Sequence, residues 1–399
     1  MRKAFLLILF ITVLPAIFPV SGSTAAFAAP GREAGIGLSS ESLPDFREVY
    51  NGHFSDVQFY DVWAEGLSHD LVISSENGFR ISLHCYEDFS EQIILSPHQG
   101  EISLTRIFVR FFAGQPGVHE ESIAHQAGES VNAALAVKAT STLSQVPAAY
   151  YASAEGNGQR LKTSLHHIIR NHQTQSYGSL WTHFQTTDAS FSGYVWDIYS
   201  DTPCTEPPYL YVFGEDQDTG SGGNAENQFY NREHSMPLSW FGGAIPPMNS
   251  DLYHIYPVDK FVNAQRANFP FGEVNNPFWL SMNGGRLGGN SLPGYSGTAF
   301  EPIDDYKGDL ARAFLYMITR YEDIVSQWDY SPEGNQMLSQ NTWPGFRPWA
   351  MEMLIRWHEE DPVSQKEIRR NDRVYQIQGN RNPFIDHPEF VERIWGDTT

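Results

Sequence analysis

The sequence predicts two regions of different fold class, an all-β sandwich followed by an α+β region. Three observations lead to this division. Short runs of β-branched and aromatic residues, separated by glycine and proline, fill the first third of the chain. A polar stretch over residues 140–147, TSTLSQVP, has the composition of a linker. Beyond it, apolar residues recur at helical spacing. A chain of 399 residues is long enough for two such domains.

Residues 35–139 are predicted to form the sandwich. The clearest strands are residues 71–74, 79–83 and 107–112, and residues 133–137 are the expected last strand. About seven short strands with turns every 8–12 residues are typical of a two-sheet sandwich. The region resembles the immunoglobulin-like modules of secreted bacterial proteins. It carries no recognisable chemistry, so we expect an accessory or spacing module.

Residues 1–28 are predicted to be a signal peptide. Arg2 and Lys3 precede an apolar stretch that runs to about residue 20, and AFA at 26–28 is a small-x-small cleavage site. Pro15 and Pro19 lie within the apolar stretch and argue against an uncleaved membrane anchor. No later segment approaches the ~20 apolar residues of a membrane span. We therefore expect an exported, monomeric mature chain, either extracellular or periplasmic.

The formal net charge is −21, and loss of Arg2 and Lys3 with the signal peptide makes it more negative. Nucleic-acid-binding proteins usually carry a basic surface. Two interpretations remain open. Either the protein does not bind nucleic acid, or the acidity belongs to the whole surface while a metal ion and a few local arginines attract phosphate.

The two cysteines, Cys85 and Cys204, fall in different predicted domains. In an exported protein they could form a disulfide, but no feature of the sequence requires it. Lone cysteines commonly behave as small core residues, so two buried free thiols are the expected outcome.

Residues 148–399 are predicted to form the α+β domain. Helices are expected over residues 148–154 and 159–171, followed by a long aromatic, loop-rich stretch to about residue 305. Asp309 is the expected N-cap of a later helix. A further helix is expected over residues 349–358. Asp361-Pro362 is the expected start of a third helix, which ends near Gly379.

Several common catalytic motifs are missing from the sequence. It has no GxSxG nucleophile turn, no P-loop and no GxGxxG fingerprint. The acidic stretch at 216–220, DQDTG, lacks the remaining ligand spacing of a calcium loop. These absences direct attention to the block of polar and aromatic residues between 230 and 272.

This block contains the residue types that phosphodiester cleavage needs. Water must lose a proton to a group that titrates near neutral pH, which favours histidine. A hard cation such as Mg²⁺ binds carboxylate and amide oxygens. His234, Glu233 and Asn263 supply this set. Arg266 follows Asn263 by three residues, so both share a face of a short helix and the guanidinium could lie near phosphate.

The block resembles the bacterial endonuclease I family, whose fold is of the ββα-metal, or His-Me finger, type. YNREHSMPLSWFGG is similar to the family's catalytic segment, and DLYHIYPVDKFVNAQRANFPFG is similar to its metal-binding helix region. GDLARAFLYMITRYED and GNRNPFIDHPEF resemble later blocks, and YYASAEGNGQRLKTSLHHII and YGSLWTHFQTTD resemble earlier ones. The resemblance covers residues 149–396.

The resemblance implies a role for each matching residue. His234 would be the general base, and Glu233 and Asn263 would bind Mg²⁺, with Mn²⁺ or Ca²⁺ as alternatives. The substrate would be DNA, and often RNA, cut with little sequence preference to leave a 5′-phosphate. Arg232, Arg266 and Arg381 are candidates for the arginine that binds phosphate. The alternative for Arg266 is an ion pair with a core carboxylate.

One departure from the family pattern motivates a second hypothesis. Tyr253 stands where the family commonly has histidine, with His254 next, and both are expected around the site rather than in it. The alternative function is therefore a secreted nucleic-acid-binding or matrix-binding protein with a weakened nuclease domain. A third option is a phosphoesterase for small phosphodiesters.

Overall fold

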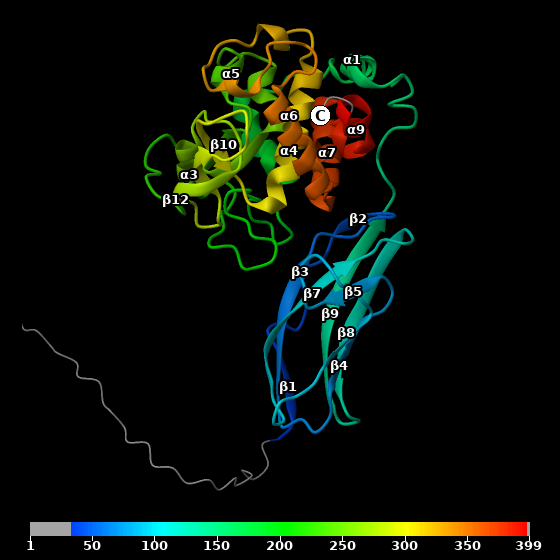
Figure 1. Cartoon of the computed structure of the whole chain (residues 1–399). Coiled ribbons are helices and arrows are strands. Elements are labelled where there is room, and N and C mark those ends of the chain that lie inside the picture. The colour runs from blue at the N-terminus through cyan, green and yellow to red at the C-terminus, as the bar shows by residue number, and fades with distance from the viewer. Residues whose placement is uncertain (1–32, 397–399) are drawn as a thin grey trace, which may run out of the picture.

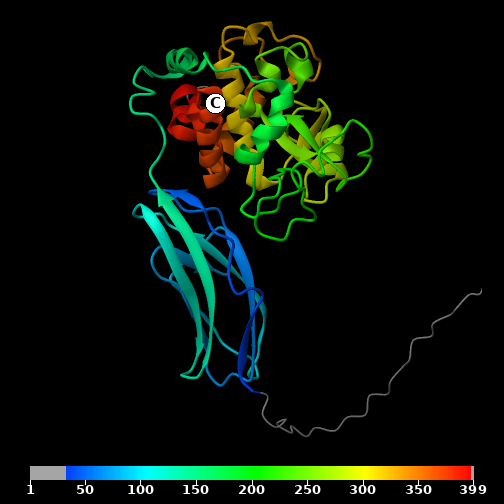
Figure 2. The same ribbon diagram turned by 180° about the vertical axis from the view of Figure 1, so that it is seen from behind.

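A computed structural model describes residues 33–396 of the chain. The predicted signal peptide, residues 1–28, lies outside these residues. Figure 1 shows an elongated β-sandwich on one side and a larger, mainly helical region on the other, and Figure 2 shows the same arrangement from behind. In residues 33–396, no helix combines the length and apolar character needed to cross a membrane.

The N-terminal region is an all-β sandwich of two sheets. Within the described residues, one sheet has the order β1-β3-β7-β5 and the other β2-β9-β8-β4-β6. Val62, Ile73, Phe79 and Ile107 face inward from both sheets and are fully buried. The strands are β1 Gly35–Leu38, β2 Glu48–Tyr50, β3 Gln58–Glu65, β4 Leu71–Ser74, β5 Phe79–Ser82, β6 Gln92–Leu95, β7 Ile102–Phe111, β8 Gly117–Ala127 and β9 Val131–Thr142.

The predicted strands are present, but the sandwich has more strands than the sequence indicates. Strands β4, β5, β7 and β9 correspond to the four predicted runs. Strands β2 and β6 have only three and four residues, too few to show a periodic pattern. β9 extends to Thr142, so the stretch predicted as a linker begins inside a strand.

The C-terminal region is α+β. The helix α4 is buried along its whole length and forms the centre of the core, with α6 packed beside it. Its helices are α1 Gly158–Ile169, α2 Leu180–Thr187, α3 Lys260–Arg266, α4 Lys307–Arg320, α5 Gly334–Met337, α6 Pro348–Glu360, α7 Gln365–Gln378, α8 Pro383–Asp386 and α9 Glu389–Trp395. Its strands are β10 Tyr230–His234, β11 Ile255–Asp259, β12 Val274–Leu280, β13 Arg286–Asn290 and β14 Thr298–Glu301.

Two predicted helix starts are wrong. Helix α4 begins at Lys307, two residues before the expected cap Asp309, because a 3₁₀ turn leads directly into it. Helix α7 is capped by Ser364, which forms a capping box with Glu367. The end of α7 at Gly379 is as predicted, and this glycine has a left-handed φ of 78°.

The helix predicted over residues 148–154 is also wrong. This stretch forms only turns, and Ala149 has a φ of 64°, which no α-helix allows. Helices α1 and α6 confirm the predictions over residues 159–171 and 349–358, apart from the end residues. The stretch described as loop-rich contains the five short strands β10 to β14 and helix α3.

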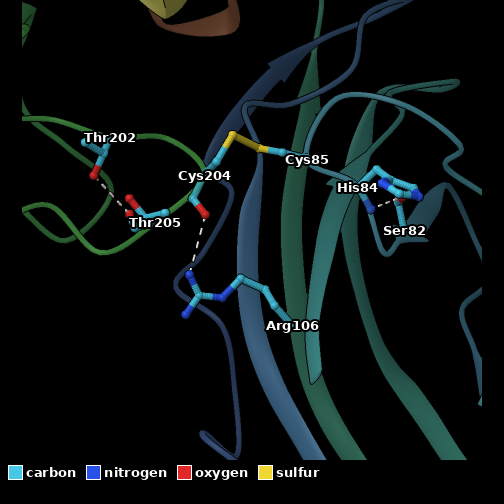
Figure 3. Close-up of a disulfide and its surroundings, with 7 residues drawn as sticks. All are labelled: Ser82, His84, Cys85, Arg106, Thr202, Cys204 and Thr205. Atoms are coloured by element: carbon cyan, nitrogen blue, oxygen red, sulfur yellow. Dashed lines mark hydrogen bonds between the residues drawn. A yellow bond between two sulfur atoms is a disulfide. The ribbon is translucent and has the colours of Figure 1, made fainter. Parts of the chain in front are cut away.

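The prediction of two free thiols is wrong. Cys85 and Cys204 form a disulfide across a sequence separation of 119 residues, and both side chains are partly exposed. Figure 3 shows that the bond joins the turn after β5 to an irregular part of the C-terminal region. Beside it, the Arg106 Nη1 donates a hydrogen bond to the Cys204 carbonyl at 3.5 Å.

Polar contacts also hold the two regions together, mainly between β2 and α7. The Tyr50 hydroxyl donates to the Asp372 carboxylate. The Arg369 guanidinium pairs with Asp56 at 2.5 Å, and Arg373 pairs with Glu48 at 3.2 Å. The interface thus combines a covalent link with partly buried ion pairs.

Because His125 is buried in the sandwich, we expect acid to lower the stability of the folded sandwich. The His125 side chain is 1% exposed, and its Nε2 lies 2.7 Å from the Tyr60 hydroxyl. Burial lowers the pKa of His125 to about 4, whereas the unfolded pKa is ~6.5. The unfolded state therefore binds the proton more tightly. This histidine's effect on stability is absent above pH 6.5 and grows as the pH falls toward 4.

We expect His125 to cost about 2–3 kcal/mol of stability between pH 7 and pH 4.5. In His125→Gln, which keeps an acceptor for Tyr60, the decrease in unfolding free energy over this range should be smaller by that amount. Urea unfolding of both proteins at the two pH values checks this. An identical pH dependence in the two proteins would contradict it.

Candidate active site

The residues singled out by the sequence lie on one ββα unit. Strands β10 and β11 pair antiparallel, with Glu233 opposite Tyr256 and His234 opposite Ile255. Helix α3 begins directly after β11. Because side chains alternate along a strand, Glu233 points to one face of β10 and His234 to the other.

Helix α3 has a strong local start signal. The Asp259 Oδ1 accepts hydrogen bonds from the backbone N–H groups of Phe261 at 2.7 Å and Val262 at 2.9 Å. This N-cap satisfies donors that a helix otherwise leaves free. It fixes the helix that carries Asn263 and Arg266 directly against the strand pair.

Glu233 is 2% exposed, and only one of its carboxylate oxygens is used inside the protein. Its Oε1 accepts from the Tyr199 hydroxyl at 2.9 Å and from the Arg266 Nη1 at 3.2 Å. Among residues 33–396, no group donates to Oε2. Burial raises the pKa of Glu233 to about 7, and Arg266 and Tyr199 oppose this effect. The carboxylate therefore has an oxygen left for a ligand and incomplete charge compensation.

Asn263 lies close to the same face of β10. Its Nδ2 donates to the Asn231 Oδ1 at 2.9 Å, which leaves its own Oδ1 without a donor in the described part of the chain. Asn231 is on the same face of the strand as Glu233. Two oxygens suited to a hard cation, one carboxylate and one amide, are thus offered by adjacent elements.

The described residues contain no group of three or more His, Cys, Asp or Glu side chains that could hold a metal ion. A structural zinc centre is normally built from such a group. The finding for the described residues is compatible with Mg²⁺, which commonly takes one or two carboxylate or amide ligands and keeps several waters.

The ring of His234, the candidate base, is held in one neutral tautomer. Its Nε2 lies 3.2 Å from the backbone carbonyl of Asn249. A carbonyl can only accept, so Nε2 carries the proton and Nδ1 has a free lone pair. No hydrogen bond reaches Nδ1 from any residue between 33 and 396. Burial, and secondarily His254, lowers the pKa of His234 to about 3, so the ring is uncharged at neutral pH.

The rings of Tyr177 and of a second histidine, His254, lie beside His234. The Tyr177 ring is stacked on it with centroids 5.7 Å apart, and the His254 ring lies at 5.5 Å. His254 is fully buried, and its Nε2 lies 2.7 Å from the Met248 carbonyl. The structure therefore places His254 beside the candidate base.

Tyr253 lies elsewhere. Its hydroxyl lies within hydrogen-bond distance of two acceptors, the Asn371 Oδ1 at 2.7 Å and the Asn380 carbonyl at 2.8 Å. Its ring packs on Tyr316 with centroids 4.6 Å apart. The side chain is 1% exposed. Tyr253 is thus part of the helical core and contacts neither Glu233 nor His234.

The three candidate phosphate-binding arginines have different environments. Arg266 is 1% exposed and donates to the carbonyls of His234 at 3.1 Å and Ser235 at 2.6 Å, in addition to Glu233. Arg381 is fully buried and pairs with carboxylates of its own region. Neither can reach a phosphate in this structure, and for Arg266 the geometry is that of the ion-pair alternative.

Arg232 is the candidate that keeps some exposure. Its guanidinium lies 3.6 Å above the Tyr177 ring and 4.3 Å from the Trp181 ring. Its Nη1 donates to the Tyr177 carbonyl at 2.7 Å. Since Arg232 and His234 are on the same face of β10, this guanidinium lies on the side of the candidate base.

Sequence reasoning missed Tyr199, Tyr177 and Asn249. Tyr199 and Tyr177 lie far upstream of the catalytic block, and no local pattern connects them with it. Asn249 acts through its backbone carbonyl, for which the side chain gives no signal. Only the fold brings these groups to Glu233 and His234.

Comparison with known proteins gives a consistent set of relatives. Residues 157–389 match the model of the family Endonuclease I. The extracellular ribonuclease of Bacillus amyloliquefaciens is 34% identical over 254 residues, which cover 62% of this chain and 78% of that protein. The extracellular ribonuclease of Bacillus subtilis (strain 168) is 33% identical with the same coverage.

Weaker matches were found to a deoxyribonuclease and to a solved structure. An extracellular deoxyribonuclease of Aeromonas hydrophila is 26% identical over 140 residues, covering 35% of this chain and 50% of that protein. Among solved structures, WR4, a C. elegans MSP family member, aligns with 10% identity and a TM-score of 0.16, covering 27% of this chain and 97% of that one.

The family match spans more than half of the chain and includes the whole ββα unit with Glu233, His234 and Asn263. The chain belongs to the endonuclease I family.

Proposed function

We propose that the protein is a secreted, metal-dependent endonuclease that hydrolyses phosphodiester bonds of DNA, with RNA as a second substrate, and with little sequence preference. The observation that carries this proposal is the state of His234. Its Nε2 proton is fixed by a backbone carbonyl, its Nδ1 is free, and Glu233 is the adjacent residue. Relatives named as extracellular ribonucleases and deoxyribonucleases support both the substrates and the secretion.

The ββα unit supports the finer fold assignment. An antiparallel strand pair is followed at once by a helix, with the base at the end of the first strand and an amide side chain on the helix. We take this unit to be a His-Me finger. We also take the N-terminal sandwich to be immunoglobulin-like, since two mainly antiparallel sheets face each other across one core.

His234 would accept a proton from the attacking water through Nδ1. The low pKa of the free ring keeps it unprotonated before substrate arrives. An anionic phosphodiester beside the ring would favour the protonated form and raise the pKa during the reaction. The Asn249 carbonyl holds the tautomer and the ring orientation throughout.

Glu233 and Asn263 would hold the cation, with Mg²⁺ first and Mn²⁺ or Ca²⁺ as alternatives. A bound cation would stabilise the charge that develops on the leaving 3′ oxygen, so that the product keeps a 5′-phosphate. Arg266 and Tyr199 orient the carboxylate by binding only its Oε1. Of the arginines, Arg232 is the candidate for contact with the phosphate backbone.

No structural observation favours the alternative of a binding protein with a weakened nuclease domain. That hypothesis depended on Tyr253, whose hydroxyl is used in the core by Asn371 and Asn380. No structural observation favours a phosphoesterase specific for small phosphodiesters either.

Replacing the base should remove most of the activity. We expect His234→Ala to lower the cleavage rate of plasmid DNA in Mg²⁺ by about 10²–10⁴-fold, the usual contribution of a general base. Chelation of the metal should abolish cleavage by the wild type. The control is His167→Ala, because His167 is exposed on α1 and far from the ββα unit in sequence. Robust cleavage by His234→Ala would rule out this base.

Replacing the amide ligand should instead weaken metal binding. For Asn263→Ala, we expect the Mg²⁺ concentration for half-maximal cleavage to rise about tenfold or more, because one of two protein ligands is lost. High Mg²⁺ should partly restore the rate of Asn263→Ala but not that of His234→Ala. Titration of plasmid cleavage with Mg²⁺ separates the two effects. An unchanged half-maximal concentration would remove Asn263 from the metal site.

A further inference from the structure

The chain between α2 and β10 contains a long irregular portion that contacts both the active site and the β-sandwich. We call residues 188–213 the connecting segment. It has no helix or strand, and the bridge between Ala189 and Val195 is its one isolated β-bridge within the described residues. Segments without regular structure open locally at low cost unless tertiary contacts hold them.

On one side, the connecting segment fixes the catalytic ββα unit. The Tyr199 hydroxyl donates to the Glu233 Oε1 at 2.9 Å. The Asp197 Oδ2 accepts from the Asp259 backbone N–H at 2.9 Å, and the Tyr211 hydroxyl donates to the Asp259 Oδ2 at 2.5 Å. Since Asp259 caps α3, the segment contacts both the candidate metal-binding carboxylate and the residue that starts the helix carrying Asn263.

On the other side, the β-sandwich holds the same segment at two points. The Arg47 Nη2 donates to the Phe191 carbonyl at 2.6 Å, and the Phe46 ring lies 6.5 Å from the Phe191 ring. The disulfide from Cys85 holds Cys204, as Figure 3 shows. One attachment precedes Tyr199 in the chain, and the other lies between Tyr199 and Tyr211.

We propose that the N-terminal β-sandwich is an internal brace of the active site: it holds the connecting segment where Tyr199 meets Glu233 and where Asp197 and Tyr211 meet Asp259. The proposal deepens the proposed function and rests on it. It makes Tyr199 a positioning residue, which acts on the cation site through Glu233.

Contacts within the C-terminal region limit the size of the effect. Arg370 pairs with Asp188 at 2.8 Å, and the Trp196 Nε1 donates to the Tyr306 hydroxyl at 2.8 Å. These contacts hold the first part of the segment without the sandwich. Loss of the brace should therefore lower the population of the binding-competent arrangement rather than abolish it. The apparent affinity for the cation falls in proportion to that population.

The test compares four variants of the full mature chain, one of which is Tyr199→Phe. Cys85→Ser with Cys204→Ser removes the covalent attachment, and Arg47→Ala removes the hydrogen bond to Phe191. Arg373→Ala is the matched control, since Arg373 pairs with Glu48 across the same two regions but lies on α7. Each is measured for the half-maximal Mg²⁺ concentration of plasmid cleavage and for hydrogen exchange of the backbone over residues 197–211 and 259–266.

We expect the double serine variant to need about threefold to tenfold more Mg²⁺, with a smaller change in the rate at saturating Mg²⁺. Hydrogen exchange in both stretches should become faster. Arg47→Ala should shift in the same direction by less, and Arg373→Ala should match the wild type. Tyr199→Phe should raise the Mg²⁺ requirement without faster exchange over residues 197–211, because it removes the contact and not the brace.

The proposal is disproved if the double serine variant keeps the wild-type Mg²⁺ requirement and hydrogen-exchange rates. It is also disproved if Arg373→Ala changes these quantities as much as Arg47→Ala does. If the double serine variant does not fold, the comparison of Arg47→Ala with Arg373→Ala decides. If the wild type itself cleaves no nucleic acid, the proposed function fails, while the exchange data still decide whether the sandwich holds the segment.

Discussion

The active site depends on the buried guanidinium of Arg266. This group joins helix α3 to the end of β10, because it donates to the Glu233 carboxylate and to the carbonyls of His234 and Ser235. A buried charge is tolerated only with such a set of partners, and removing one partner of a buried pair typically costs 3–5 kcal/mol. The same contacts fix the relative positions of Glu233, His234 and, through the helix, Asn263. Arg266 therefore organises the candidate site, although its side chain is buried.

The buried arginines of this domain do not supply the basic surface that nucleic-acid-binding proteins usually carry. Arg266, Arg312, Arg370 and Arg381 are all buried and paired with carboxylates. These charges hold the fold together and do not form a basic surface. With a net charge of −21, the chain as a whole repels nucleic acid at long range. Under the proposed function, capture of phosphate would then depend on the candidate cation site and on local groups such as Arg232, which lies on the same face of β10 as His234.

The sequence predicts those features that local chemistry determines. Gly379 ends α7 as predicted, because a left-handed φ favours glycine. Glu233, His234 and Asn263 are candidates from the sequence because their side chains suit phosphodiester hydrolysis, and their roles stay a prediction. Prediction from local sequence fails where a residue contacts a group that is distant in the sequence. Asp361 looks like an N-cap, but its carboxylate accepts from the Gly308 N–H at 2.8 Å, and Ser364 caps the helix instead. The Cys85–Cys204 bond and the Tyr199 contact likewise join positions that no local pattern relates.

The orientation of Glu233 shows how these distant contacts enter the chemistry. Both of its donors, Arg266 from α3 and Tyr199 from the connecting segment, bind the same oxygen, Oε1. A carboxylate with both donors on one oxygen presents the other to a ligand, and two donors from independent elements fix its rotation better than one. Arg266 is secured by the ββα unit itself. Tyr199 comes from an irregular stretch, and irregular stretches place side chains accurately only when a rigid scaffold holds them. The site therefore needs support from outside the ββα unit, and the disulfide and Arg47 provide it from the β-sandwich.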